Sequence, residues 1–593
     1  MQPSERLETI LEIFQEINAI PRCSKMEERI ARYLTKRAED AGFSVRRDAV
    51  GNLSIRVPAS AGGEGAQAVV LQGHMDMVCE KRNDSTHDFS KDPIRMHRDG
   101  DWLKADGTTL GADNGIALAL ALALAEDKSL ARPPLELLFT VDEETGLTGA
   151  NGMEKDLVQG RILLNIDSED EGIFTVGCAG GVESRIKKSF DFAPIEPDAV
   201  LFHLEAGGMR GGHSGVDIHK QRANAIHILA RALDRIGRVA GIRLVAIEGG
   251  KSHNAIPRHA WARFSCAGND CENIHEMLLS VERAVRMEHA DSDPSLRLNL
   301  KGQEGGTGQE QAIAPEASLN LIRLLVALPD GVQAMSQQME GLVETSCNLA
   351  KVFMKKEGLE IVTSQRSSVM SRLEEITRRV ETVAALAGAE STRLNAYPTW
   401  EPNLDSPLLA RCTRVYRDLF GAEPGVEAVH AGLECAVIGA KYPEMDMISF
   451  GPTIRNPHSP DEALYLPSVE KVWEFLETLV ASFAEPPPLL IPINKFRNIH
   501  PDEGLNRILG IFLKKNSGRL RVKLYASPVA GRPHCGRTLS LLGVTACRAP
   551  DGRGILWRSS GCRRPVPPPP IVPGECASRR RWEGPWGCPS TST

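Results

Sequence analysis

The stretch that decides the fold class is "LELLFTVDEETG", residues 135–146. Its first half is an apolar run of strand length, and its second half sets Asp142, Glu143 and Glu144 side by side. Adjacent carboxylates repel one another, so a loop with only a structural role gains little from this crowding. We therefore expect one of these carboxylates to hold a positive ion while a neighbour does different work.

Two other strand-like runs end on polar residues of the same kind. "VVLQGHMD" ends on His74 and Asp76, and "ILLNID" ends on Asp167. Acidic residues often end strands simply because loops are exposed to solvent, so one such strand alone would not indicate a metal site. Three of them, one carrying the pattern H-x-D, indicate a shared metal site.

Helical and strand patterns alternate through about the first 180 residues, which predicts an α/β domain with a largely parallel central sheet. Ligands of such sheets bind beyond the carboxyl ends of the strands. At 593 residues the chain is too long for one hydrophobic core. We predict four parts: the first domain at 1–180, an inserted α/β domain at 181–392, a return to the first domain at 393–485, and a tail at 486–593.

The tail differs in composition from the rest of the chain. From residue 486 onward it holds 18 Lys and Arg against 5 Asp and Glu, which leaves 52 against 72 for the body. Its Pro-, Arg- and Cys-rich sequence does not support a packed core, so we expect a disordered extension or the product of an altered reading frame. It lacks the patterns of nucleic-acid-binding and membrane-binding segments, so neither partner is predicted.

Cysteine usage and apolar runs indicate a cytoplasmic protein. Eight of the 13 cysteines precede the tail without a CxxC pair, and we expect them to be buried reduced thiols. The first 22 residues have the pattern of a charged amphipathic helix and not that of a signal peptide. The longest apolar run, "IALALALALA" at 116–125, is about half a membrane span and is predicted to be a buried helix.

Two further candidates for metal binding lie outside the strand ends. Asp113 in "GADNG" precedes a helix, where backbone N–H groups favour an anion, although a helix N-cap is the simpler interpretation of that residue alone. His458 in "RNPHSP", taken alone, would be a surface loop histidine. A catalytic metal site needs carboxylate and imidazole ligands from separate elements, and this set provides them.

The ordered set H-x-D, G-A-D-N-G, D-E-E-x-G, N-x-D and a late histidine resembles the M20 metallopeptidases over about residues 5–484. The resemblance implies a zinc-peptidase catalytic domain interrupted by a lid domain through which two subunits form a homodimer. Segments such as "GHMDMVCEK" and "DEETGLTGA" are most similar to the aminoacyl-histidine dipeptidase branch. That branch implies hydrolysis of carnosine-like Xaa-His dipeptides.

The resemblance also implies two zinc ions, bridged by Asp113 and by a water or hydroxide. One ion would take His74 and Asp167, and the other would take Glu144 and His458. The charges then balance, because two Zn²⁺ ions offset three carboxylates and one hydroxide. Nitrogen and oxygen donors suit zinc, and Mn²⁺ or Co²⁺ could substitute.

The remaining strand-end acids receive different roles. By the same resemblance, Asp76 would accept a hydrogen bond from His74 and fix its tautomer. Glu143 would be the general base that takes a proton from the attacking water. Asp142 is left without a role, and we expect it to be a solvated residue at the end of its strand.

The resemblance places the substrate contacts mainly in the inserted domain. His213 in "GGHSG" would reach a neighbouring active site across the dimer, or would simply be a histidine in a glycine-rich turn. Asn254 and Arg366 would bind the substrate backbone and its free carboxylate. The "HAGLE" segment at 430–434 would line the pocket for the C-terminal residue.

Other functions stay open at this point. The chain could be a different M20 hydrolase, such as a tripeptidase or an N-acyl-amino-acid deacylase. It could also be a non-catalytic binding protein on the same fold, although all five implied ligands and both acid–base residues are present.

Overall fold

The computed structural model describes residues 3–303, 310–355 and 358–484, together with the backbone of four short strands at 489–492, 520–525, 544–548 and 555–559. The chain divides into two units, Met1–Pro486 and Pro487–Thr593. The predicted disorder or altered reading frame of the tail concerns residues that mostly lie outside the described ones. The part of the second unit that is described forms one small sheet of β26 (Leu489–Pro492), β27 (Leu520–Tyr525), β28 (Val544–Arg548) and β29 (Ile555–Ser559).

The first domain is built on an eight-stranded mixed sheet with the strand order β1-β2-β6-β3-β7-β23-β8-β22. Its central strands β6, β3, β7 and β23 run parallel, whereas β1, β2 and β6 pair antiparallel at one edge. The predicted α/β class with a largely parallel centre is confirmed. The strands are β1 (Ser44–Arg47), β2 (Leu53–Val57), β3 (Val69–His74), β6 (Leu135–Thr140), β7 (Ile162–Asn165), β8 (Ile173–Cys178), β22 (Gly425–Val429) and β23 (Asp446–Ser449).

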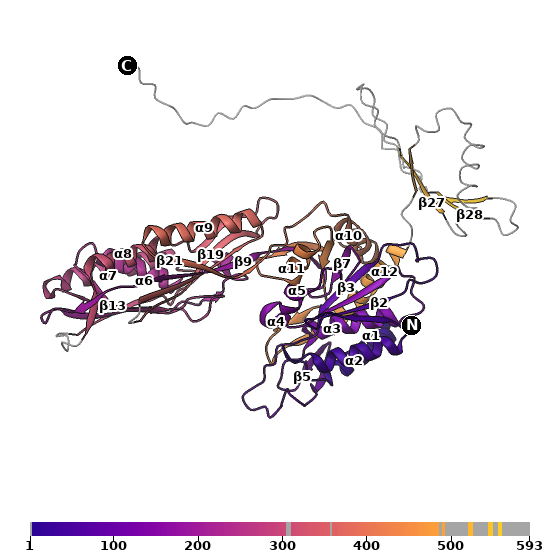
Figure 1. The fold of residues 1–593 in the computed structure, drawn as a ribbon, viewed down its shortest axis with the longest axis horizontal. Coiled ribbons are helices and arrows are strands. Elements are labelled where there is room, and N and C mark those ends of the chain that lie inside the picture. Colours follow the sequence, from indigo (N-terminus) through magenta and orange to yellow (C-terminus); the bar gives the residue numbers. More distant parts are fainter. Residues whose placement is uncertain are drawn as a thin grey trace, which may run out of the picture. The chain divides into compact units, whose positions relative to one another are not determined.

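Helices cover both faces of this sheet (Figure 1). Val69 and Leu71 of β3 share a core with five helices on one face, and Val70 packs with two short helices on the other. Successive strand residues point to opposite faces, so a strand covered on both sides is apolar throughout. The first face carries α1 (Pro3–Asn18), α2 (Glu28–Asp40), α3 (Ala112–Glu126), α10 (Pro407–Phe420) and α12 (Leu466–Ala484), and the second carries α5 (Thr148–Gly152) and α11 (Glu434–Lys441).

The apolar run that was predicted to be a buried helix is α3. Every residue from Asn114 to Ala125 is buried, and the helix packs against α1 and β3. No helix of the described residues is long and apolar enough to cross a membrane. Next to α3, a small four-stranded sheet is formed by β4 (Met96–Asp99), β5 (Trp102–Ala105), β24 (Ile454–Arg455) and β25 (Ala463–Tyr465).

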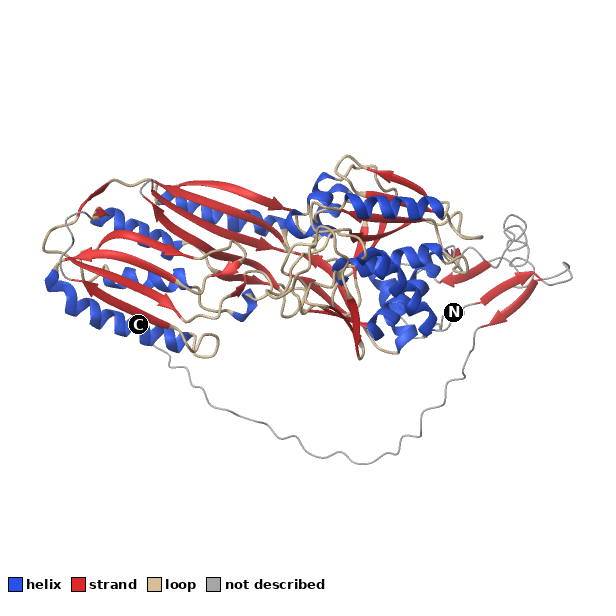
Figure 2. Cartoon of the chain, turned by 90° about the horizontal axis from the view of Figure 1, so that it is seen from below, coloured by secondary structure: helices blue, strands red, loops and turns tan. Residues whose placement is uncertain are grey.

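The inserted domain is a nine-stranded antiparallel sheet with the order β16-β11-β15-β13-β19-β20-β9-β21 and with β18 paired to β19. Figure 2 shows its strands side by side. The strands are β9 (Gly180–Lys188), β11 (Val200–Gly207), β13 (Arg243–Gly249), β15 (Ala260–Cys266), β16 (Arg297–Gln303), β18 (Gly331–Met335), β19 (Val343–Lys355), β20 (Gly358–Ser367) and β21 (Glu390–Tyr397).

Four helices share one core with this sheet and lie along one side of it (Figure 1). They are α6 (Ala225–Ile236), α7 (Cys271–Glu288), α8 (Pro315–Ala327) and α9 (Met370–Leu386). Two short ribbons complete the domain. They pair β10 (Phe192–Pro194) with β17 (Gln311–Ile313) and β12 (Gly212–His213) with β14 (Ala255–Ile256).

The prediction that the cysteines of the body are reduced thiols is wrong for two of them. Cys23 and Cys79 form a disulfide, with their Cα atoms 5.7 Å apart. They are 56 residues apart in sequence, and only the fold brings them together, through an isolated bridge between Cys23 and Met77. The other six cysteines of the body are free, and five of these are buried.

Removal of core volume in α3 should destabilise the protein. Leu120 is fully buried, whereas Leu386 at the end of α9 is 84% exposed. We expect Leu120→Ala to lower the free energy of unfolding by about 2–5 kcal/mol. The same substitution at Leu386 should change it by less than about 0.5 kcal/mol. Urea unfolding followed by circular dichroism measures both, and equal effects would contradict the prediction.

Candidate metal and catalytic site

The three strand ends singled out in the sequence meet at one edge of the central sheet. His74 is the last residue of β3 and lies opposite Thr140, the last residue of β6. Asn165 ends β7 opposite Gln72, which brings Asp167 to the same edge. Because these strands are adjacent and parallel, their carboxyl ends coincide.

Asp113 lies between two histidines from distant parts of the chain. Its Oδ1 is 3.1 Å from His74 Nε2, and its Oδ2 is 3.0 Å from His458 Nε2. The residue stands in the first turn of α3, and the peptide bond that follows it is cis. One carboxylate with an oxygen on each imidazole has the arrangement of a bridging ligand.

Each histidine has a second carboxylate beside it. Asp167 Oδ1 is 3.5 Å from His74 Nε2, and Glu144 Oε2 is 3.0 Å from His458 Nε2. The five side chains therefore form two groups, each with one imidazole and one carboxylate, and Asp113 joins the groups.

The donor atoms of these two groups fit a divalent metal. Zinc binds nitrogen and oxygen ligands at about 2.0–2.1 Å in tetrahedral geometry, which sets neighbouring donors about 3.3 Å apart. The four separations given above lie between 3.0 and 3.5 Å. Glu144 Oε1 is also buried without a hydrogen-bond partner among the described residues, and a cation would satisfy it.

The carboxylates draw protons onto both imidazoles. Burial acts to lower the pKa of His74, but Asp167 and Asp113 raise it well above its ordinary value. Hydrogen bonds with Asp113 and Glu144 raise the pKa of His458 to about 11. Because only neutral imidazole is a metal ligand, metal binding would displace these protons.

Burial and mutual repulsion also raise the pKa values of two carboxyl groups at this edge. Burial raises the pKa of Asp167 to about 6, and the nearby Asp113 adds to this rise. Burial together with Asp113 and Asp167 raises the pKa of Glu169 to about 8. Carboxylates outnumber cationic side chains at this edge, and a divalent cation would relieve the repulsion.

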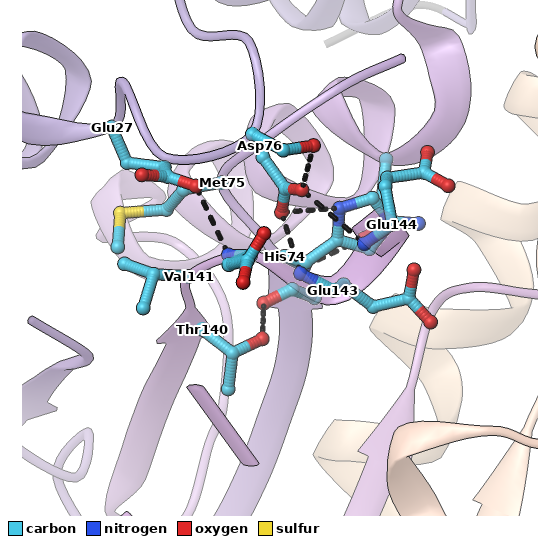
Figure 3. Close-up of polar contacts among 12 residues, drawn as sticks. Glu27, His74, Met75, Asp76, Thr140, Val141, Glu143 and Glu144 are labelled. Atoms are coloured by element: carbon cyan, nitrogen blue, oxygen red, sulfur yellow. Dashed lines mark hydrogen bonds and ion pairs between the residues drawn. The ribbon is translucent and has the colours of Figure 1, made fainter. Parts of the chain in front are cut away.

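Asp76 ties the end of β3 to the end of β6 (Figure 3). Its Oδ1 lies 3.3 Å from His74 Nδ1 and accepts a hydrogen bond from the amide of Glu143 at 3.0 Å. Its Oδ2 accepts from the amide of Glu144 at 3.3 Å and from Ser24 Oγ at 2.8 Å. Burial raises the pKa of Asp76, but His74 and these donors outweigh burial and lower the pKa to about 2. The residue is therefore ionised at neutral pH and orients both the imidazole and the acidic turn.

Glu143 and Glu144 open α4 (Glu143–Gly146), a single turn that follows β6. Figure 3 shows both side chains on the side of the turn away from Glu27. Burial raises the pKa of Glu143 well above its ordinary value, and the carboxylates of Asp167 and Glu434 add to the rise. A carboxylate with a raised pKa is a stronger proton acceptor, as a general base requires.

Asp142 is not the solvated residue that the sequence predicted. It is 4% exposed, and its φ of +50° lies in the left-handed region. Its carboxylate accepts hydrogen bonds from the hydroxyls of Thr145 and Thr148, and its amide donates to Glu27 Oε1 at 3.0 Å. The prediction was wrong because the chain turns sharply into α4 here, so the carboxylate is enclosed by threonine hydroxyls instead of facing water.

His458 approaches the site from a strained loop. Its φ is +58° and that of Asn456 is +52°, and residues other than glycine rarely adopt such values. The His458 side chain is 51% exposed, whereas that of His74 is 1% exposed. The site is therefore closed at His74 and open to solvent at His458.

The three substrate-binding candidates lie in the inserted domain. His213 is in β12, which pairs with β14, and Asn254 directly precedes β14. Arg366 is 8% exposed on β20 and donates a hydrogen bond to the Tyr397 hydroxyl at 2.6 Å. Within the described part of the chain, no hydrogen bond or ion pair joins these three residues to the metal-ligand candidates.

In this second group, Arg366 lies near two histidines, His213 and His430, and affects their pKa values. Burial and the nearby Arg366 lower the pKa of His213. The same two causes lower the pKa of His430, in the "HAGLE" segment, to about 3. His430 also shares a hydrogen bond of 2.7 Å with Ser346 Oγ. Arg366 forms no ion pair among the described residues, so its buried guanidinium is suited to receive an anion.

Two buried charged residues at the site were not predicted. Arg22 donates to the backbone carbonyls of Asp76 at 2.9 Å and of Gly111 at 2.6 Å. Glu462 accepts hydrogen bonds from the amides of residues 110–113. No pattern around Arg22 distinguishes it from a surface arginine. The position of Glu462, four residues after a candidate ligand, was the one available signal.

Comparison with known proteins identifies the family of the chain. Residues 70–482 match the family model described as Peptidase family M20/M25/M40. The cytosol non-specific dipeptidase of Escherichia coli (strain K12) is 40% identical over 469 residues, which are 79% of this chain and 96% of that protein. The acetylornithine deacetylase of Myxococcus xanthus is 28% identical over 289 residues, 45% of this chain and 69% of that protein.

A solved structure has the same fold. The crystal structure of aminoacylhistidine dipeptidase from Vibrio alginolyticus matches with a TM-score of 0.75 at 38% identity, over 80% of this chain and 96% of that one. The family model spans well over half of the chain, and it includes all of the metal-ligand candidates. The chain therefore belongs to peptidase family M20/M25/M40, and the reaction class that goes with this membership is the hydrolysis of peptide bonds.

Proposed function

We propose that this chain is a dinuclear zinc dipeptidase that hydrolyses Xaa-His dipeptides of the carnosine type. The observation that carries the proposal is the position of Asp113 between His74 and His458, with Glu143 directly before the ligand candidate Glu144. Family membership implies a divalent metal, and the nitrogen and oxygen donors of this site fit one.

Five side chains would hold the metal. His74 and Asp167 would bind one zinc ion, Glu144 and His458 would bind the other, and Asp113 would bridge them. The donor set suits zinc and also admits Mn²⁺ or Co²⁺. When bound, the two ions would polarise the scissile carbonyl and lower the pKa of the attacking water.

Glu143 would transfer the proton of the attacking water, and Asp76 would orient Glu143 and His74. Glu143 takes a proton from the attacking water and returns it to the leaving amine nitrogen. Its raised pKa fits this role, because the carboxylate must accept the proton before it delivers it. Asp76 holds the amide of Glu143 and faces His74 Nδ1, so it fixes the base and the imidazole relative to each other.

The inserted domain would bind the substrate. Arg366 would pair with the free carboxylate of the dipeptide, and Asn254 would bind its backbone. His213 would help to hold the oxyanion of a neighbouring active site. Among the described residues, no hydrogen bond or ion pair joins these side chains to the metal-ligand candidates of their own chain, and the proposal therefore includes a homodimer formed through the lid domain.

The relatives leave the choice of dipeptide to experiment. The Vibrio structure is named for aminoacyl-histidine substrates, whereas the Escherichia coli relative is named a non-specific dipeptidase. A dipeptidase without preference for histidine is therefore the second candidate. The Myxococcus relative is a deacetylase, so an N-acyl-amino-acid deacylase is a more distant alternative. We place the protein in the cytoplasm, since the Escherichia coli relative carries a cytosolic name.

Replacement of the proposed base should abolish turnover and spare the metal. We expect Glu143→Gln to lower kcat on β-Ala-His by about 10²–10⁴-fold. The zinc content measured by mass spectrometry should stay near that of the wild type, because Glu143 is not a ligand. Loss of both zinc ions from this variant would contradict the assigned role.

The neighbouring acid should behave in the opposite way. We expect Glu144→Ala to reduce the zinc content to about one ion per chain, since one of the two metal positions loses a ligand. The same elemental analysis after gel filtration measures this, with Glu143→Gln as the matched control. Unchanged zinc content in Glu144→Ala would refute the ligand assignment.

A substrate panel separates the candidate functions. We expect kcat/KM for β-Ala-His and Ala-His to exceed that for Ala-Leu by at least about tenfold, because a pocket built for imidazole leaves polar groups unpaired with leucine. Equal values would indicate a non-specific dipeptidase. Turnover of N-acetylhistidine alone, or of a tripeptide alone, would rule out the dipeptidase proposal.

A further inference from the structure

Glu462 holds the backbone just ahead of Asp113 by four hydrogen bonds. Its Oε2 accepts from the amides of Leu110 and Gly111 at 2.7 and 2.9 Å. Its Oε1 accepts from the amides of Ala112 and Asp113 at 2.8 and 3.2 Å. Glu462 is 2% exposed, and both oxygens of this buried carboxylate accept hydrogen bonds from one stretch of backbone, which offsets the cost of burying its charge.

Arg22 binds the same stretch of backbone through a carbonyl oxygen, that of Gly111. Its Nη2 donates to the carbonyl of Gly111 at 2.6 Å, and its Nη1 donates to the carbonyl of Asp76 at 2.9 Å. Gly111 has a φ of +70°, and a Cβ at this position would lie 2.5 Å from Arg22 Nη2. Gly111 is therefore held through its N–H by Glu462 and through its C=O by Arg22, with no room for a side chain.

Glu462 also belongs to the segment that carries His458. It follows His458 by four residues, and its own amide donates to the carbonyl of Ser459 at 3.0 Å, which closes a turn. The loop with His458 and the loop with Asp113 are separated by more than 300 residues in sequence. One carboxylate joins them in space.

We propose that Glu462 is a positioning residue for the metal centre. It sets the backbone of Asp113 relative to His458, so that the Asp113 carboxylate reaches both imidazoles. The inference rests on the proposed function in so far as Asp113 and His458 bind metal. Glu462 itself binds neither metal nor substrate, because both of its oxygens are occupied by backbone amides.

A helix cap that only stabilises the fold would have a different signature. A carboxylate at the start of α3 stabilises that helix whether or not metal is bound. Its loss would lower Tm equally with and without zinc and would leave zinc affinity unchanged. A positioning residue holds the ligands in binding geometry, so its loss weakens zinc binding and reduces the gain in Tm that zinc produces.

The test uses Glu462→Gln in the full chain, where an NH2 group replaces one of the two acceptor oxygens and faces amide donors. We expect zinc affinity, measured on the metal-free protein by competition with a chelating dye, to fall by about 10–100-fold. We expect kcat to fall while KM stays nearly unchanged. Glu462→Asp, which keeps both oxygens, should recover part of the affinity.

Asp461→Asn is the matched control. Asp461 precedes Glu462, its side chain is 67% exposed, and it forms a surface ion pair with Arg82. Its zinc affinity should stay within about twofold of the wild type, because surface pairs contribute little. Wild-type zinc affinity in Glu462→Gln, with an equal loss of Tm in both metal states, would overturn the proposal.

Two further arms keep the result interpretable. Zinc affinity is measured without any peptide, so it reports on Glu462 even where the proposed dipeptide substrates are not turned over. Should Glu462→Gln not fold, Arg22→Lys carries the same test. It keeps the charge but shortens the reach to the Gly111 carbonyl, and it should weaken zinc binding in the same way. Unchanged affinity in Arg22→Lys would then count against the proposal.

Discussion

Repulsion among carboxylates is the constraint on which the first domain depends. Asp113, Glu144 and Asp167 converge where parallel strands and a helix meet, within 3.0–3.5 Å of the two imidazoles. Burial of such a cluster in a hydrophobic domain is unfavourable unless compensating positive charge and hydrogen-bond donors are close by. The buried guanidinium of Arg22 and the amides gathered around Asp76 supply part of this compensation, and a divalent metal would supply the rest.

Most of the first domain could be predicted from the sequence because buried parallel strands leave a strong signal. The runs that became β3, β6 and β7 are mainly apolar, and polar residues gather at or just after their carboxyl ends. The helix α3 could also be predicted, because its run of alanines and leucines leaves no polar face to contact water. Once the strands are known to be parallel and adjacent, the meeting of His74, Asp167 and the acidic turn follows from geometry.

What could not be predicted depends on contacts between segments far apart in the sequence. Asp142 is buried because a left-handed turn folds two threonine hydroxyls onto it, and no local pattern shows this. The Cys23–Cys79 disulfide and the fully buried Arg22 both require that the segment after α1 lie against the end of β3. Residue type and spacing indicate candidate ligands, but they do not reveal the buried residues that contact the backbone around those candidates.

The place of β23 in the sheet has a consequence for the order of events during synthesis. This strand lies between β7 and β8, yet the whole inserted domain separates it from them in the chain. All strands of the inserted domain have been made once Tyr397 leaves the ribosome, so that domain can finish folding first. The edges of β7 and β8 must meanwhile wait unpaired, a state that invites wrong pairing with other chains. During synthesis, therefore, the inserted domain can be complete while the sheet of the first domain still lacks β22 and β23.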